Sequence, residues 1–275
     1  MRGLPIGLAL GALLVGLLGV TGLLSLVWTP HDPAAIDVAL RFRDPSADHP
    51  LGTDQLGRDM LSRLMAASVN TLVVAFLAVA AGGLIGVALG LMASALGGWA
   101  EALVMRACDL GFAFPAILLA VMLSTAFGPS LGNTILAIAF INVPVFARVT
   151  RGAANQIWAR DFVTAARALG LSGAEITWRH ILPNIAPLLI VQATIEFAVA
   201  ILAEAALSYL GLGAQPPTPS WGRMLSEAQT LMFLAPDLAI LPGLCIFLAV
   251  LGFGLLGDGL RDLTDPRLVR ARVNA

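Results

Sequence analysis

Residues 71–95 read TLVVAFLAVAAGGLIGVALGLMASA, and no charged side chain interrupts them. A helix that crosses a bilayer needs about 20 mostly apolar residues, because each residue adds about 1.5 Å along the axis. This stretch therefore predicts a membrane-spanning helix. Five other stretches have the same character, so the sequence predicts an all-α, polytopic membrane protein with six transmembrane helices. The predicted spans are Leu4–Trp28, Thr71–Ala95, Val104–Phe127, Leu131–Phe146, Pro187–Leu210 and Leu238–Leu256.

The composition of the whole chain excludes most other classes of protein. Of its 275 residues, 58% are hydrophobic and 12% are charged, and this charged share is about half that of a soluble domain. A soluble globule of this length exposes too much surface to hide so much apolar material. A soluble enzyme and a disordered chain are therefore excluded. The net charge of −1 gives no indication of nucleic-acid binding.

The arginines predict which side of the membrane each loop faces. If the N-terminus lies inside the cell, eleven arginines fall on the inner side and five on the outer side. Cytoplasmic loops are the ones enriched in basic residues, so both termini are expected in the cytoplasm. The first apolar run is longer than the core of a signal peptide, which indicates a retained helix.

The long loops divide the chain into four expected segments. They are 1–28, the first span; 29–70, an outer loop with a short interfacial helix; 71–256, a five-helix core that includes an inner loop over 147–184 and an outer loop over 211–237; and 257–275, a cytoplasmic tail.

The inner loop carries the most informative pattern. Residues 151–184 read RGAANQIWARDFVTAARALGLSGAEITWRHILPN, which is rich in the helix formers Ala, Arg and Leu. Gly170 favours a helix end in the left-handed conformation, and Ser172 with Glu175 favours a capped start of a second helix. Pro183 is expected to stop that second helix. The loop therefore predicts a helix, a sharp turn and another helix under the membrane.

The first of these two helices offers a face for another protein. Ala165 and Ala166 are small enough for a partner to approach closely, and Arg167 adds charge beside them. The alternative interpretation is an amphipathic surface helix that has no partner.

The same loop resembles the signature motif of the permease subunits of binding-protein-dependent ABC importers. That motif reads E-A-A, three residues, G, nine residues, I-x-L-P. The matching residues here are Thr164, Ala165, Ala166, Gly170, His180, Ile181, Leu182 and Pro183. Thr164 stands in place of Glu and His180 in place of Ile, whereas the Ala pair, the glycine, the Leu-Pro pair and both spacings match.

Three further stretches resemble one subgroup of these permeases. They are HPLGTDQLGRD over 49–59, LSYLGLG over 207–213 and PPTPSWG over 216–222. The subgroup is the second, shorter permease subunit of dipeptide, oligopeptide and nickel importers, and the resemblance extends from about His49 to Pro266. It implies di- or oligopeptides as cargo, with nickel or a nickel complex as the alternative.

The resemblance also implies partners and a location. The partners are a second homologous permease subunit, two cytoplasmic ABC ATPases and an external solute-binding protein, at a bacterial plasma (inner) membrane. The residues implied to couple the ATPases to the spans are Thr164, Ala165, Ala166, Arg167, Gly170 and Pro183. The chain lacks a G-x-x-x-x-G-K-[ST] phosphate loop. ATP and Mg²⁺ are therefore expected on the ATPases, this chain is expected to bind no cofactor, and it is not expected to be an enzyme.

Two acidic residues, Glu196 and Glu204, lie inside the fifth predicted span. An ionisable group at membrane depth is costly, and it generally faces a cavity or a polar partner. We expect both on one broad helix face, where Glu204 above all lines or gates a pathway. The alternative is a structural hydrogen bond to another helix or to the partner subunit.

The outer loops hold a second group of candidate residues. Asp54 and Arg58 have the i, i+4 spacing of a pair on a short helix, and Asp59 follows them directly. We expect these three residues to form an interfacial structural element near a docking surface. Trp221, in the proline-rich second outer loop, is expected to belong to the same outer edge.

No metal site is expected from the sequence. A site in which Asp48 and His49 join the outer-loop acids Asp54 and Asp59 is conceivable but is not the favoured interpretation. His31 and His180 are interpreted as surface or capping groups. Cys108 and Cys245 lack a metal-binding spacing and are interpreted as buried free thiols.

Two rival classes of function stay open at this point. A stand-alone secondary transporter usually shows internal repeats, and it has no need of the 165–183 loop. An intramembrane zinc protease needs an H-E-x-x-H motif, which the sequence lacks. Dependence of uptake on ATP or on an ion gradient separates the importer from the secondary transporter.

Overall fold

The computed structural model describes residues 6–264, and every regular element in that range is helical. The elements are α1 (Ile6–Ser25), η1 (Val38–Leu40), α2 (Met60–Leu96), α3 (Gly98–Ala113), α4 (Ala116–Phe127), α5 (Leu131–Trp158), α6 (Asp161–Ala168), α7 (Gly173–Ile176), η2 (Thr177–Ile181), α8 (Leu182–Tyr209), α9 (Trp221–Ala228), η3 (Gln229–Leu231) and α10 (Asp237–Thr264). The predicted all-α class is confirmed. The start of the first predicted span and the end of the predicted tail lie outside the described residues.

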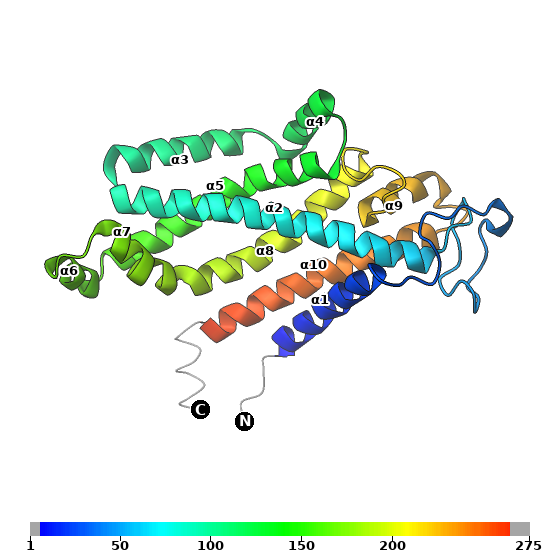
Figure 1. Ribbon diagram of the computed structural model, residues 1–275, viewed down its shortest axis with the longest axis horizontal. Coiled ribbons are helices and arrows are strands. Elements are labelled where there is room, and N and C mark those ends of the chain that lie inside the picture. The colour runs from blue at the N-terminus through cyan, green and yellow to red at the C-terminus, as the bar shows by residue number, and fades with distance from the viewer. Residues whose placement is uncertain (1–5, 265–275) are drawn as a thin grey trace.

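The helices form an elongated bundle. In Figure 1, α2, α5 and α8 run side by side through the middle, α1 packs on α10 along one edge, and α3 lies along the opposite edge. The α1–α2 connection and α9 lie at one end of the bundle, and α6 and α7 lie at the other. We call these the α9 end (residues 26–59 and 211–236) and the α6 end (residues 159–181).

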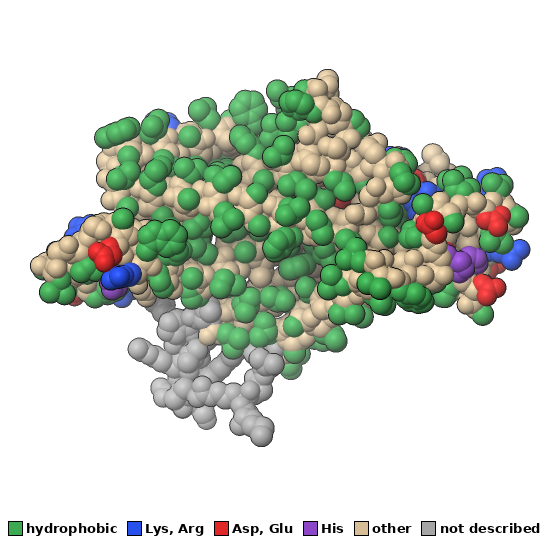
Figure 2. Space-filling view, in the orientation of Figure 1, with side chains coloured by type: hydrophobic (Ala, Val, Ile, Leu, Met, Phe, Trp, Pro, Cys, Tyr) green, Lys and Arg blue, Asp and Glu red, His purple; other side chains and the backbone are tan. Residues whose placement is uncertain are grey.

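The expected spans are present as five long helices and one broken pair. The five are α1, α2, α5, the continuous α7–α8 segment and α10, and α3 with α4 makes a sixth if the bent pair counts as one span. Figure 2 shows hydrophobic side chains over the middle of the molecule, whereas acidic, basic and histidine side chains gather mainly at its two ends. This distribution is typical of a polytopic membrane protein.

Three glycines let α2 approach α5 very closely. Gly82, Gly86 and Gly90 are spaced four residues apart, so they lie on one face of α2. A Cβ atom on any of them would fall within 2.6 Å of a backbone carbonyl oxygen of α5. Close approach at small residues is the main source of helix association inside a membrane, because burial of apolar surface gives little there. This interface therefore fixes the centre of the bundle.

The predicted span over Val104–Phe127 is present as two helices that meet at a sharp bend. α3 ends at Ala113, Phe114 has extended backbone with φ −93° and ψ 115°, and α4 then departs at 80° to α3. The cause is Pro115, because a proline ring disfavours helical backbone at the residue before it.

The prediction that Pro183 stops a helix is wrong. Pro183 lies in the first turn of α8, directly after the π-helical turn η2, and the helical run continues through it without a break. α5 likewise continues past Pro144 to Trp158, well beyond its predicted end at Phe146. As a result, the inner loop is shorter than predicted, and α7, η2 and α8 follow one another without a break.

The first outer loop also differs from the prediction. α2 begins at Met60, so residues 60–70 belong to the helix instead of the loop. No α-helix carries Asp54 and Arg58, and the described part of the loop contains only the short 3₁₀ turn η1. Asp59 caps α2 by accepting a hydrogen bond from the amide of Ser62.

Candidate functional site

A short connection of two residues joins the end of α5 at Trp158 to the start of α6 at Asp161. α6 begins at Asp161, directly after Arg160, and ends at Ala168, and Leu169 and Gly170 follow it. Gly170 has φ +86°, in the left-handed region that glycine adopts without strain. The amide of Leu171 donates to the carbonyl of Ala166 at 3.2 Å across this turn. The predicted turn at Gly170 is therefore present, and so is the Ser172 cap, which accepts from the Glu175 amide.

The two alanines of the predicted docking face point in different directions. Ala166 is buried with Val163 against the rest of the protein, whereas Thr164, Ala165 and Arg167 are exposed. The expectation that both alanines present one small-residue face is therefore wrong. An eight-residue helix with a buried i, i+3 pair must turn the residues between them outward.

The buried side of α6 belongs to an apolar cluster that we call the α6 anchor. Its buried members are Leu91, Ala154, Val163, Ala166, Ile176, Ile181, Ile185 and Leu189. They come from α2, α5, α6, α7, η2 and α8, and Arg167 adds a stacking contact, with its guanidinium 4.9 Å from the centre of the Trp158 ring. Because this packing is close, a displacement of α6 has to displace the ends of three spans as well.

At the α9 end, four charged side chains form an ion-pair network. Arg58 Nε lies 2.6 Å from Asp54 Oδ2, and Arg58 Nη2 lies 2.8 Å from Glu227 Oε2. Arg63 pairs with the same two carboxylates: its Nη1 contacts Asp54, and its Nη2 lies 2.9 Å from Glu227 Oε2. The predicted Asp54–Arg58 pair is therefore present, although in a loop. Arg63 and Glu227 were missed by the sequence analysis.

The network joins the α1–α2 connection and the start of α2 to α9. Burial acts to raise the pKa of Glu227, but the charges and hydrogen bonds of Arg63 and Arg58 outweigh it, so the pKa lies below its usual value. The carboxylate is thus ionised and paired at neutral pH. A signal for this pairing exists in the sequence, because Arg63 is a lone charge at the start of a long apolar stretch.

We expect the Glu227→Gln variant to be less heat-stable at neutral pH by roughly 5–10 °C, since removal of one partner from a largely buried pair costs about 3–5 kcal/mol. The depressed pKa stabilises the fold fully above the unfolded pKa, and this contribution disappears as the pH falls through the folded pKa. The variant should therefore lose less stability on acidification than the parent. Thermal unfolding of the purified protein in detergent between pH 7 and pH 4 measures both effects.

A matched control comes from Glu175, whose Oε1 lies 3.1 Å from Arg179 Nη1 in an exposed i, i+4 pair. Such pairs contribute about 0–1 kcal/mol, so Glu175→Gln should leave the melting temperature nearly unchanged. Equal effects of the two substitutions would contradict the assignment of the network as an anchor of α9.

Trp221 is a structural residue of the α9 end. Its side chain is fully buried, its indole Nε1 donates to the carbonyl of Leu64 at 3.4 Å, and its amide donates to Thr71 Oγ1 at 3.4 Å. Both acceptors lie on α2, so Trp221 fixes the start of α9 against that helix. It offers no exposed surface for docking.

Asp59 lies beside both histidines of the α9 end. His49 Nδ1 is 2.9 Å from Asp59 Oδ1, and the rings of His31 and His49 stack with centroids 4.4 Å apart. His31 thus lies at the surface, as interpreted, but it is not alone there, because it contacts His49 and Asp59. Burial acts to raise the pKa of Asp59, but hydrogen bonds from Ser62 and His49 outweigh it and lower the pKa.

The two intramembrane acids are both buried. Glu196 Oε1 accepts from Gln192 Nε2 at 2.8 Å, within α8. Glu204 has no exposed surface, and its Oε1 accepts from Ser208 Oγ at 2.6 Å. Ser208 Oγ in turn accepts from the amide of Ala214. In this conformation Glu204 lines no open surface. Its hydrogen bond stays within α8, and through Ser208 it reaches the loop that follows that helix, so neither the pathway role nor a bond to another helix is shown.

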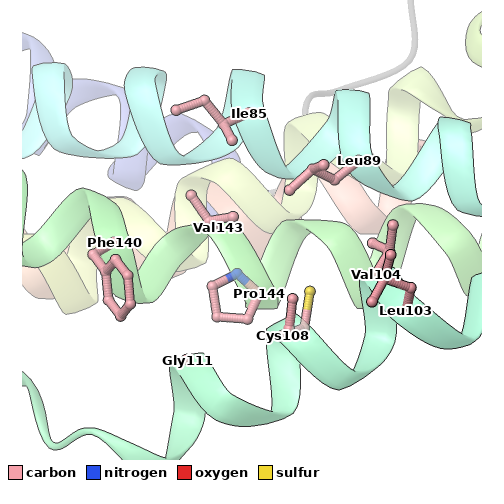
Figure 3. Close-up of a pocket in the computed structure, with 10 residues that line it drawn as sticks. Ile85, Leu89, Leu103, Val104, Cys108, Gly111, Phe140, Val143 and Pro144 are labelled. Carbon is pink, nitrogen blue, oxygen red and sulfur yellow. The ribbon is translucent and has the colours of Figure 1, made fainter.

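An apolar cleft of about 440 Å³ lies between α2, α3 and α5. Figure 3 shows side chains from all three helices around it, among them Ile85, Cys108, Phe140 and Pro144. The lining offers no charged group and no amide or hydroxyl side chain, so it has nothing to orient a charged or peptide-like molecule.

Comparisons with known proteins support the interpretation of the inner loop. Residues 82–270 match the family described as the binding-protein-dependent transport system inner membrane component. The chain is 42% identical to the dipeptide transport system permease protein DppC of Alkalihalophilus pseudofirmus, over 93% of this chain and 86% of that protein. It is 44% identical to the glutathione transport system permease protein GsiD of Pectobacterium atrosepticum, over 82% of this chain and 74% of that protein.

Among solved structures, the fold is similar to a chain of the MetNI methionine ABC transporter in an inward-facing conformation. The TM-score is 0.64 at 19% sequence identity, and the match covers 75% of this chain and 98% of that chain. At this identity the likeness concerns the fold alone.

Proposed function

This chain belongs to the family of inner membrane components of binding-protein-dependent transport systems, and from that premise we propose that it forms half of the pathway of an ATP-driven peptide importer. A second homologous permease subunit supplies the other half. Two cytoplasmic ABC ATPases bind below the pair, and a solute-binding protein delivers cargo from outside. The ATPases hold ATP and Mg²⁺, so this chain needs no cofactor and catalyses no reaction itself.

The observation that carries this proposal is the construction of α6. The helix presents Thr164, Ala165 and Arg167 to the surroundings, while Val163 and Ala166 hold it on the α6 anchor. In this arrangement an ATPase binds the exposed side of α6. When the ATPase moves, α6 moves with it and displaces the ends of α2, α5 and α8 through the α6 anchor. Gly170 makes the turn that returns the chain toward α8, and Pro183 lies in the first turn of that helix.

The proposal fixes the orientation of the chain. The α6 end faces the cytoplasm, the α9 end faces outward, and both termini lie in the cytoplasm, in a bacterial inner membrane. The excess of arginines on the side of α6 supports this orientation. The ion-pair network then lies at the end on which the solute-binding protein docks, and the buried Trp221 holds α9 in place there.

Short peptides are the proposed cargo. Two relatives above 40% identity are named for the transport of a dipeptide and of glutathione, and both molecules are short peptides. Peptides are therefore preferred to nickel or a nickel complex.

The test is co-purification from native membranes followed by a transport assay. The tagged chain is solubilised in a mild detergent, and its partners are identified by mass spectrometry. The recovered complex is then placed in liposomes, and uptake of a labelled dipeptide is measured with ATP or with a non-hydrolysable analogue. The expected result is a second permease, two ATPases and uptake only with hydrolysable ATP. Uptake that ignores ATP and collapses with an ionophore would support a secondary transporter instead.

A further inference from the structure

Two histidines and one aspartate converge at the α9 end from three separate segments. His31 follows α1, His49 lies in a turn of the α1–α2 connection, and Asp59 caps α2. One ligand atom from each residue lies within 4.8 Å of the other two. His49 Nδ1 is 2.9 Å and His31 Nδ1 is 3.9 Å from the same oxygen, Asp59 Oδ1.

Hydrogen bonds to the other carboxylate oxygen of Asp59 orient its side chain so that Oδ1 faces the two imidazole rings. Ser62 donates to the other carboxylate oxygen, Asp59 Oδ2, from its amide at 2.8 Å and from its hydroxyl at 2.6 Å. The same hydroxyl accepts from the amide of His31 at 3.0 Å. Ser62 therefore orients two of the three residues, as the outer partners of metal ligands do.

Hydrogen bonds also fix the backbone of His49. Its amide donates to Ser46 Oγ at 3.1 Å, and its carbonyl accepts from the amides of Ser46 and Gly52 at 2.9 Å each. Its side chain is only 9% exposed, and that of Asp59 is fully buried. Two of the three donor groups are thus fixed in place within the fold.

The donor set suits a divalent transition-metal ion. Two imidazole nitrogens and one carboxylate oxygen, with a water molecule as fourth ligand, are typical of Zn²⁺. Tetrahedral bonds of about 2.0–2.2 Å place ligand atoms about 3.4 Å apart. The distances of 2.9 Å and 3.9 Å to Asp59 Oδ1 lie on either side of that value. Binding an ion therefore requires the His49 nitrogen to move away from Asp59 Oδ1 and the His31 nitrogen to move toward it.

The site also has access to solvent. The His31 side chain is 40% exposed, so an ion can enter past it and keep one water ligand. We propose that His31, His49 and Asp59 bind a Zn²⁺ ion, which ties the α1–α2 connection to the start of α2. The site is separate from the proposed transport function, because it uses none of the residues assigned to coupling or to the pathway.

Zinc content after chelation and reloading tests the proposal directly. The full chain or its native complex is purified with a tag that contains no histidine, stripped with a chelator, incubated with Zn²⁺ and desalted. We expect about one zinc per chain by elemental analysis and a higher melting temperature after loading. Co²⁺ in place of Zn²⁺ should give the strong visible absorption of a tetrahedral site.

Three variants make the test specific. His31→Gln removes a half-exposed ligand, so the protein should still fold, and it should weaken zinc binding at least about tenfold. His49→Gln should have the same effect. His180→Gln is the matched control, because His180 lies at the α6 end beside Phe162 and should bind zinc like the parent.

Two outcomes would overturn the proposal. One is a parent protein that retains no zinc after loading and desalting. The other is zinc that binds the parent and all three variants equally, which would mark adventitious binding only. Because the His31→Gln variant is scored on folded, monodisperse protein, neither result is confused with unfolding.

Discussion

Substituting leucine for Gly86 is expected to leave almost no folded protein in detergent extracts. A Cβ atom at this position would lie 2.5 Å from the carbonyl oxygen of Val143 and 2.7 Å from the Cβ of Phe146. The backbone of α5 would have to move away to relieve these two close contacts, and that movement would open the α2–α5 interface along its whole length. Even Gly86→Ala should lower the melting temperature clearly, whereas the leucine side chain separates the two helices.

The control is Gly16→Leu. Gly16 lies in α1, and a Cβ atom added there meets no other atom within 4 Å. The Gly16→Leu substitution adds the same volume and the same apolar area as Gly86→Leu, but no helix has to move to make room for it. The measurement is the fraction of protein that elutes as a single symmetrical peak in size-exclusion chromatography. If Gly86→Leu and Gly16→Leu give equal peaks, the α2–α5 contact is not the one that fixes the bundle.

The second large effect concerns coupling: Ala165→Glu should lower ATP-driven uptake at least tenfold while the folded protein reaches normal levels. Ala165 is exposed on α6, so the longer, charged side chain fits without disturbing the α6 anchor. In the proposed complex the same side chain is pressed against an ATPase, where it clashes and loses its water. Uptake in proteoliposomes and the amount of co-purified ATPase are the two measurements.

Thr164→Glu is the matched control for this substitution. It introduces the same side chain one position earlier on the same exposed stretch, and the motif of this permease family carries Glu at that position. We expect it to retain or raise uptake. Loss of uptake in both variants, with the ATPases still attached, would mean that added charge on α6 is harmful wherever it lies. Normal uptake by Ala165→Glu would contradict the assignment of α6 as the coupling helix.

The sequence predicted the class of this fold well because apolar length is a strong signal in a membrane protein. All six predicted spans correspond to helices, and the family resemblance seen in the inner loop is confirmed by the match over residues 82–270. The turn at Gly170 was predictable too, because a helix often ends at a residue with positive φ and glycine adopts that conformation without strain.

The effect of each proline was not predictable in the same way. Pro115 breaks a span, whereas Pro144 lies within an unbroken helix and Pro183 lies in the first turn of another. Whether a proline breaks its helix depends on the residues that pack against it from other helices. Pro144 lies on a helix held against the α2 glycines, and its ring packs near Gly111, so tertiary contacts compensate for the missing hydrogen bond. A single sequence does not contain those contacts.

The candidate sites divide in a similar way. The Asp54–Arg58 pair is local and follows from spacing, but Glu227 joins it from far along the chain. The convergence of His31 on Asp59 depends in the same way on how the α1–α2 connection folds back. Pairings of this kind follow from the packing of loops, and no periodicity in the sequence encodes them.

The unbroken run from α7 through η2 to α8 has a mechanical consequence. Its 37 residues span about 55 Å, so it acts as a lever that crosses the membrane. A tilt of about 5° at one end displaces the other end by about 5 Å, which follows from that length. Glu204 and Ser208 lie near the far tip of this lever, and α6 is attached at its base. In the proposed importer, a small rotation at the base would thereby become a movement of several ångströms at the other end of the helix.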